Sequence, residues 1–156
     1  MISVEVVSEE KKWSKKIKEK DVFFYSICRA FPKKYKFINK KIFLTLLLSN
    51  NKSIKKLNKK FRNKNKPTDI LSFPLHEKIK LKKNLYLGDM IISYDFMNKP
   101  KALNILEFKN KITKIFIHGF LHLLGYDHIK LKDFKVMLIE EEKIYQTIKK
   151  KIAKIV

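Results

Sequence analysis

Short segments with alternating or continuous apolar residues predict β-strands along this chain, and longer stretches with helical spacing separate them. Apolar residues alternate with polar ones from Ile2 to Val6, as in a half-buried strand. Residues 42–49 form a compact run of leucine and β-branched side chains, as in a buried strand. On the same grounds, further strands are predicted at 69–73 and 86–93, and helices at about 15–31, 54–62, 106–124 and 133–151.

The ends of the predicted helices carry residues that stop or cap a helix. Pro32 ends the first helix, Ser53 is placed to cap the second, and Gly125 follows the third. No internal repeat and no linker rich in glycine, serine or proline divides the chain. Strands mixed with helices in this order indicate an α+β fold. We expect one domain over residues 1–156, with a small mixed sheet of about four strands packed against helices.

The net charge of the chain limits the classes of molecule that it is expected to bind. Among 156 residues, 37 lysines and arginines stand against 15 acidic residues, which gives a formal net charge of +22. Such an excess points to a polyanion, either nucleic acid or an anionic membrane surface. The other explanation is a compositional preference for lysine. With 45% hydrophobic residues the chain can build a core, so disorder over its whole length is excluded.

No segment of the sequence is predicted to span a membrane, and the cysteine content does not indicate an oxidising compartment. The longest apolar runs, such as residues 42–48, fall far short of the roughly 20 residues that span a bilayer. The N-terminus lacks the apolar stretch of a secretion signal. The single cysteine, Cys28, cannot form an internal disulfide and is expected to be a packed core thiol. We therefore expect a soluble cytoplasmic protein without a membrane partner.

Three of the four histidines, His118, His122 and His128, lie close together in the chain. Residues four apart project from one face of a helix, so His118 and His122 can bind one ion. Gly125 permits a left-handed turn that brings His128 to the same place. Three neutral imidazoles with one open position are the ligands of a catalytic zinc. The metal site is thus expected on the central helix and the turn after it, unless the first two are ordinary core histidines of a buried helix.

The spacing of these histidines equals that of the metzincin peptidases, H-E-x-x-H-x-x-G-x-x-H. In that motif a glutamate general base follows the first histidine, whereas this chain has Gly119. Because a general base contributes about 10²–10⁴-fold to the rate, peptide hydrolysis is disfavoured. Gly119 is one of only three glycines, and we expect it to let another element or the substrate approach the helix closely.

With this histidine motif in hand, the chain resembles the YbeY family of bacterial rRNA maturation factors, which are metal-dependent endoribonucleases. Residues 118–128 match the family signature H-G-x-L-H-L-x-G-Y-D-H. Residues 57–74 resemble L-N-x-x-Y-R…K-P-T-N-V-L-S-F-P, with Phe61 in place of the usual tyrosine and Asp69 in place of the usual asparagine. Residues 87–92 are similar to the family's L-G-D-[IV]-x-I strand.

The resemblance implies that His118, His122 and His128 hold one Zn²⁺ ion and that Arg62 is an important arginine of the cleft. It also implies a single-strand-specific endoribonuclease that acts on ribosomal RNA and ribosomal particles, in 16S rRNA 3′-end maturation and ribosome quality control. Two alternatives stay open at this point. One is a non-catalytic ribosome-assembly factor with a structural metal, and the other is a metal hydrolase with a different substrate, such as a peptide.

Arg62 also stands out in the sequence itself, because Arg29 and Arg62 are the only arginines among the 37 basic residues. A guanidinium can hold a phosphate through two parallel hydrogen bonds, which an ammonium cannot do. Asn58 and Arg62 lie one turn apart on the predicted helix and are expected to border a groove, although Arg62 could equally be a solvated helix end. Every charged residue from 52 to 66 is basic, as in a phosphate track or simply a solvated face.

Other side chains have candidate roles around such a site. Phe61 and Tyr126 either stack on bases or pack in the core. Asp127 is expected to orient a ligand, and His76 to lie in a surface loop. Glu141 falls on an apolar stripe of the last helix and so needs a partner, either a ligand imidazole or a lysine. Asp127 and Glu141 are the two candidates for an assisting general base. The expected stripe consists of Phe134, Leu138, Tyr145, Ile148 and Ile152.

Overall fold

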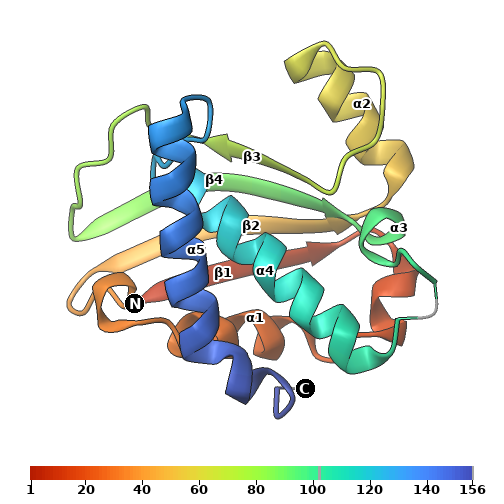
Figure 1. Ribbon diagram of the computed structural model, residues 1–156, viewed down its shortest axis with the longest axis horizontal. Helices are drawn as coiled ribbons and strands as arrows, with labels where there is room; N and C mark the ends of the chain where they lie inside the picture. Colours follow the sequence, from red (N-terminus) through yellow and green to blue (C-terminus); the bar gives the residue numbers. More distant parts are fainter. Residues whose placement is uncertain (102, 156) are drawn as a thin grey trace.

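Four strands form one mixed sheet in the order β1-β2-β4-β3 (Figure 1). The computed structural model describes residues 1–101 and 103–155. β1 (Ile2–Ser8), β2 (Lys41–Ser49) and β4 (Asn84–Ser93) run parallel, and β3 (Ile70–Pro74) pairs antiparallel with β4 at one edge. All four strands coincide with the predicted ones to within a few residues at each end. The prediction of a single α+β domain with a small mixed sheet is confirmed.

Helices pack on both faces of the sheet, but unequally. The main core lies between the sheet and α1 (Lys20–Arg29), α4 (Ile105–Leu123) and α5 (Leu131–Ile152). α2 (Asn51–Arg62) packs on the opposite face, because its Ile54 forms a second cluster with Leu71 of β3 and Ile91 of β4. Neighbouring strand residues point to opposite faces, which is why Ile70 and Ile92 belong to the main core instead. This arrangement places the C-terminal end of α2 beside the edge strand.

Two of the predicted helix starts are wrong, and one short helix was not predicted. Residues 15–19 do not belong to α1: a 3-10 turn, Lys11–Lys15, precedes it and buries Trp13, whose Nε1–H donates to the carbonyl of Ser49 at 3.0 Å. α2 is capped by Asn50, whose side chain accepts from the backbone N–H of Ser53 at 3.0 Å. Both residues are good caps, so sequence preference alone could not choose between them. The other unpredicted elements are α3 (Tyr94–Met97) and a second 3-10 turn, Lys33–Tyr35.

Gly119 brings α4 directly against the edge of the sheet. A Cβ atom at this position would lie 2.5 Å from Ile70 Cδ1 and 2.5 Å from Met90 Sδ, which is closer than real contacts allow. The hydroxyl of Ser72 donates to the Gly119 carbonyl at 3.3 Å. The predicted close approach is therefore made by β3 and β4, and it sets the neighbouring His118 beside the edge strand. None of the described helices is both long and apolar enough to cross a bilayer.

Candidate metal centre

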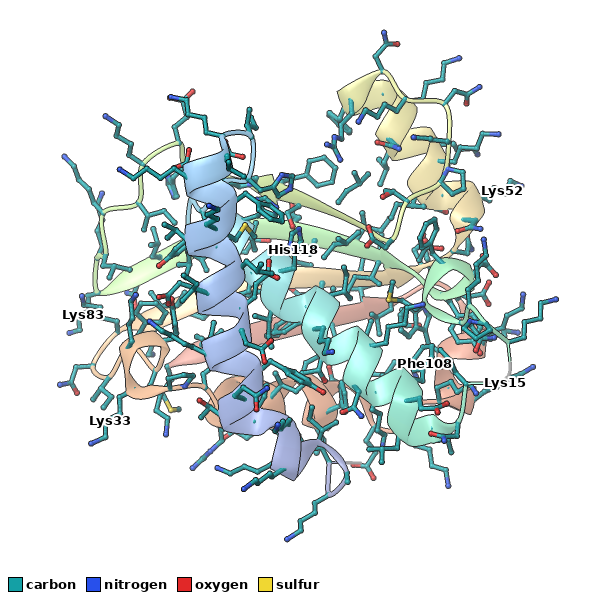
Figure 2. All side chains as sticks on the ribbon, viewed as in Figure 1. Lys15, Lys33, Lys52, Lys83, Phe108 and His118 are labelled. Carbon is teal, nitrogen blue, oxygen red and sulfur yellow. The ribbon has the colours of Figure 1, made fainter. Side chains whose placement is uncertain are left out.

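The structure brings His118, His122 and His128 together. Figure 2 places His118 on α4, and His122 follows one turn later. One ring nitrogen from each of the three residues lies within 4.8 Å of the other two. The ring centroids are 4.6 Å apart for His118 and His122, 4.8 Å for His122 and His128, and 5.6 Å for His118 and His128. A group of this kind can hold a metal ion.

A tight turn after α4 brings His128 back to the other two histidines. The Tyr126 N–H donates to the Leu121 carbonyl and the Gly125 N–H to the His122 carbonyl, both at 3.0 Å, which is the bonding pattern of a Schellman motif. Gly125 has φ +96°, so the predicted left-handed turn is present. Asp127 then accepts from the backbone N–H of His128 at 2.6 Å and of Ile129 at 3.2 Å. Asp127 thus orients His128 by accepting from the backbone N–H of that histidine, not from its imidazole ring.

The outer ring nitrogens of two histidines are already occupied. His118 Nδ1 lies 2.5 Å from a carboxylate oxygen of Glu141, and His122 Nδ1 lies 3.0 Å from the carbonyl oxygen of Tyr126. A carbonyl and an ionised carboxylate can only accept, so each Nδ1 carries the proton. In the neutral imidazoles both Nε2 atoms are therefore lone-pair acceptors, yet they face each other at 3.1 Å. Two facing acceptors call for a cation between them, so these residues fit a metal ion.

His122 is held in the form that binds a metal. Burial lowers its pKa below the ordinary value of 6.5, because an imidazolium loses hydration in the partly buried site. The neighbouring rings of His118 and His128 lower this pKa further by charge repulsion. Metal ligation requires neutral imidazole, so the surroundings of His122 favour it.

Arg62 lines the same cleft as the three histidines. The cleft has a volume of about 580 Å³ and lies between the end of α2 and β3 on one side and the turn after α4 on the other. Arg62 is the last residue of α2, and its side chain is exposed to solvent. The other residues at the cleft are Phe61, Thr68, Asp69, the whole of β3, Asp127 and Ile129.

Asn58 does not border the cleft with Arg62, contrary to the prediction. Its side chain is 1% exposed, and its Nδ2 donates to the carbonyl of Lys66 at 2.8 Å. The backbone carbonyl of Asn58 accepts from the backbone N–H of Lys64 at 3.2 Å. Asn58 therefore fixes the loop that follows α2. The lysines of this region stay exposed and form no ion pair within the described part of the chain: Lys52, Lys55, Lys56, Lys59, Lys60, Lys64 and Lys66.

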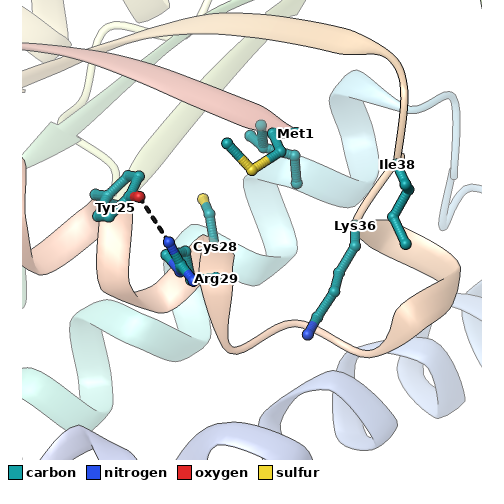
Figure 3. A pocket seen from close by; sticks show the side chains of 7 residues that line it. Met1, Tyr25, Cys28, Arg29, Lys36 and Ile38 are labelled. Carbon is teal, nitrogen blue, oxygen red and sulfur yellow. Dashed lines mark hydrogen bonds between the residues drawn. The ribbon is translucent and has the colours of Figure 1, made fainter.

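The two arginines lie in different surroundings. Arg29 lies in a separate pocket near the N-terminus, where it donates to the hydroxyl of Tyr25 at 3.0 Å (Figure 3). Cys28 in the same pocket is buried, and burial raises the pKa of its thiol, as expected of a packed core cysteine. Arg29 therefore offers a natural comparison for Arg62.

The prediction of the apolar stripe on α5 is partly wrong, although Glu141 does have a partner as that prediction required. Phe134 and Leu138 are 46% and 52% exposed. The buried positions are Met137, Glu140, Ile144, Ile148 and Ile152. Glu141 borders them, and of its two expected partners it contacts the imidazole of His118. Sequence reasoning missed the buried Glu140, whose carboxylate accepts from the hydroxyl of Tyr35 and pairs with Lys34 at 3.3 Å.

Of the two aromatic candidates for base stacking, only Phe61 lines the cleft. Tyr126 is half-buried and packs against the main core, with its hydroxyl 3.3 Å from that of Tyr35. His76 is partly exposed in the loop between β3 and β4, as predicted, and lies outside the histidine group.

Replacing Glu141 with alanine is expected to weaken metal binding about 10- to 100-fold, because His118 loses the acceptor that orients its ring. Titration of the metal-free protein with zinc against a competing chelator measures this change. Glu142→Ala is the matched control, since Glu142 is exposed and contacts Gln146 instead of a histidine. Equal affinities in the two variants would show that the contact between Glu141 and His118 does not support the ligand.

Comparison with known proteins shows the family to which the chain is similar. The family model described as Endoribonuclease YbeY matches residues 4–149. An Endoribonuclease YbeY of Pelagibacter ubique is 69% identical over 153 residues, which cover 98% of this chain and all of the relative. One from Ehrlichia canis is 37% identical over 135 residues, covering 86% of this chain and 85% of the relative. A solution structure of a Thermotoga maritima protein matches with a TM-score of 0.53 and 26% identity, over 95% of this chain and 89% of that one.

The family model spans nearly the whole chain, and the relatives are matched over most or all of their own length. The matched range includes the three histidines and Arg62. This chain therefore belongs to the YbeY family of endoribonucleases.

Proposed function

We propose that this protein is a metal-dependent endoribonuclease whose single domain binds one Zn²⁺ ion through His118, His122 and His128 and cleaves single-stranded RNA. Besides the metal ion, the side chain of Arg62 takes part in catalysis. The observation that carries the proposal is the convergence of three imidazoles and one exposed arginine on one cleft. The names of the relatives support the endonuclease activity, and the exposed lysines beside the cleft suit a polyanionic substrate.

The proposed substrate is ribosomal RNA, in free form and in ribosomal particles. The family resemblance implies a role in 16S rRNA 3′-end maturation and in ribosome quality control, and the proposed location, from the sequence, is the cytoplasm. A chain of net charge +22 meets the electrostatic requirement of such a partner.

The chemistry follows from the residues that surround the cleft. When bound, zinc lowers the pKa of a coordinated water to about 7 and polarises a phosphoryl oxygen. Arg62 donates two hydrogen bonds to the scissile phosphate and neutralises the charge that develops in the transition state. Glu141 holds the proton on His118 Nδ1, and Asp127 holds the backbone of His128. Both carboxylates therefore position ligands, and neither is assigned as the general base.

Metal removal tests the proposal. Protein purified without an added metal or a His-tag is expected to contain one zinc per chain and to cleave a single-stranded fragment from the 3′ end of 16S rRNA. Treatment with a chelator should abolish cleavage, and one equivalent of zinc should restore it. Casein, incubated in parallel, should stay intact. Undiminished RNA cleavage by the chelated protein would overturn the metal requirement, and cleavage of casein but not RNA would overturn the substrate class.

A further inference from the structure

Phe61 is an exposed aromatic ring next to the residue proposed to hold phosphate. It lies in the last turn of α2, directly before Arg62, and 58% of its surface is accessible to solvent. Its ring packs edge-to-face with Phe73 of β3 at a centroid distance of 5.2 Å, and both rings line the cleft. One part of Phe61 is thus fixed by Phe73 while the larger part stays free.

The packing of α2 does not explain this exposure. Ile54 is fully buried beneath the helix, and Leu57, one turn before Phe61, is half-buried against the same cluster. The helix is therefore anchored by its first two turns, and the exposed part of Phe61 adds nothing to that core. The ammonium of the exposed Lys60 lies over the Phe61 ring, 5.2 Å from its centroid, so a stacking base would use the opposite face or displace this flexible side chain.

An exposed aromatic ring that is held against a second ring, beside an arginine and a lysine-rich helix, is an arrangement on which unpaired nucleobases can stack. We propose that Phe61 is the stacking platform for an unpaired base next to the scissile phosphate, and that it thereby determines the preference for single strands. This inference rests on the proposed function. A base can lie flat on a protein ring only after it leaves its own helix, so paired RNA cannot use the platform.

A second apolar side chain lines the cleft from the other side. Ile129, which follows His128, is 84% exposed and belongs to the turn after α4. A base lying on Phe61 would find an apolar wall at Ile129 and the guanidinium of Arg62 at its phosphate. The cleft thus provides separate contacts for the base and for the backbone.

The test compares Phe61→Leu with Phe61→Trp, because leucine keeps an apolar side chain without a planar ring, whereas tryptophan keeps the ring. Phe43→Leu is the matched control, since Phe43 is an exposed phenylalanine of β2 away from the cleft. The probes are a short single-stranded RNA, the same RNA with abasic nucleotides around the cleavage site, and its duplex. KM and kcat are measured with the zinc-loaded protein.

Phe61→Leu is expected to raise KM for the single strand about tenfold, whereas Phe61→Trp and Phe43→Leu stay within twofold of wild type. Abasic nucleotides should impair wild type by a similar factor and Phe61→Leu hardly further, since both changes remove the same contact. The preference for single strand over duplex should shrink in Phe61→Leu. Equal KM values for Phe61→Leu and wild type would overturn the platform and leave the proposed function intact, whereas a wild type that cleaves no RNA would overturn the proposed function itself.

Discussion

Alanine in place of His122 is expected to abolish metal binding and to slow RNA cleavage at least about a thousandfold. The ring centroid of His122 is 4.6 Å from that of His118 and 4.8 Å from that of His128, so all three rings border one place. Its loss leaves two ligands, too few for a zinc site. A bound metal supplies several kcal/mol of transition-state stabilisation, and about 4 kcal/mol corresponds to a thousandfold in rate.

The matched control for this prediction is His76→Ala, which removes the one histidine outside the group. Metal content by elemental analysis and single-turnover cleavage rates should separate the two variants. The metal-free His122→Ala protein should unfold at about the same temperature as metal-free wild type. The substitution removes the hydrogen bond from His122 to the Tyr126 carbonyl, but it also removes one of two lone pairs that face each other at 3.1 Å. A His122→Ala protein that retains one metal and cleaves at the wild-type rate would contradict the ligand assignment.

The ligand group could be predicted from the sequence because it is local. His118 and His122 share one helix, and Gly125 marks the turn to His128, so spacing and helix geometry are sufficient. The strands could also be predicted, because alternation marks the half-buried β1 and a short apolar run marks the buried β2. Arg62 is different, because it lies at the same cleft as the histidines only through the packing of α2 against the sheet edge. Its place in the cleft followed from family resemblance, not from spacing.

Other features depended on tertiary contacts that no local pattern encodes. On α5 apolar residues occur on more than one side, so periodicity could not fix which stripe is buried, and Phe134 and Leu138 were wrongly placed in it. Tertiary contacts also decide that Phe61 lines the cleft whereas Tyr126 packs against the core. Both are aromatic residues near charged groups, but only the packing of Tyr126 against the core separates their roles.

Arg62→Ala is expected to lower kcat about 10²–10³-fold while leaving the metal content unchanged. Loss of one preorganised donor to a developing oxyanion costs a factor of this size. Arg62 lines the cleft and forms no hydrogen bond or ion pair with the three histidines in the described structure, so metal binding should not respond. Arg62→Lys is expected to recover only part of the rate, because lysine retains the charge but lacks the two parallel donors.

Arg29 supplies the control for charge alone. Arg29→Ala removes the same charge from the chain's other arginine, which lies in a separate pocket and bonds to Tyr25. If the rate depended only on the overall positive field, both alanine variants would slow cleavage equally, and added salt would reduce the difference from wild type. If Arg62 holds the scissile phosphate, only its own substitution lowers kcat, and the deficit persists at saturating RNA. Equal kcat values in the two variants would exclude Arg62 from the catalytic step.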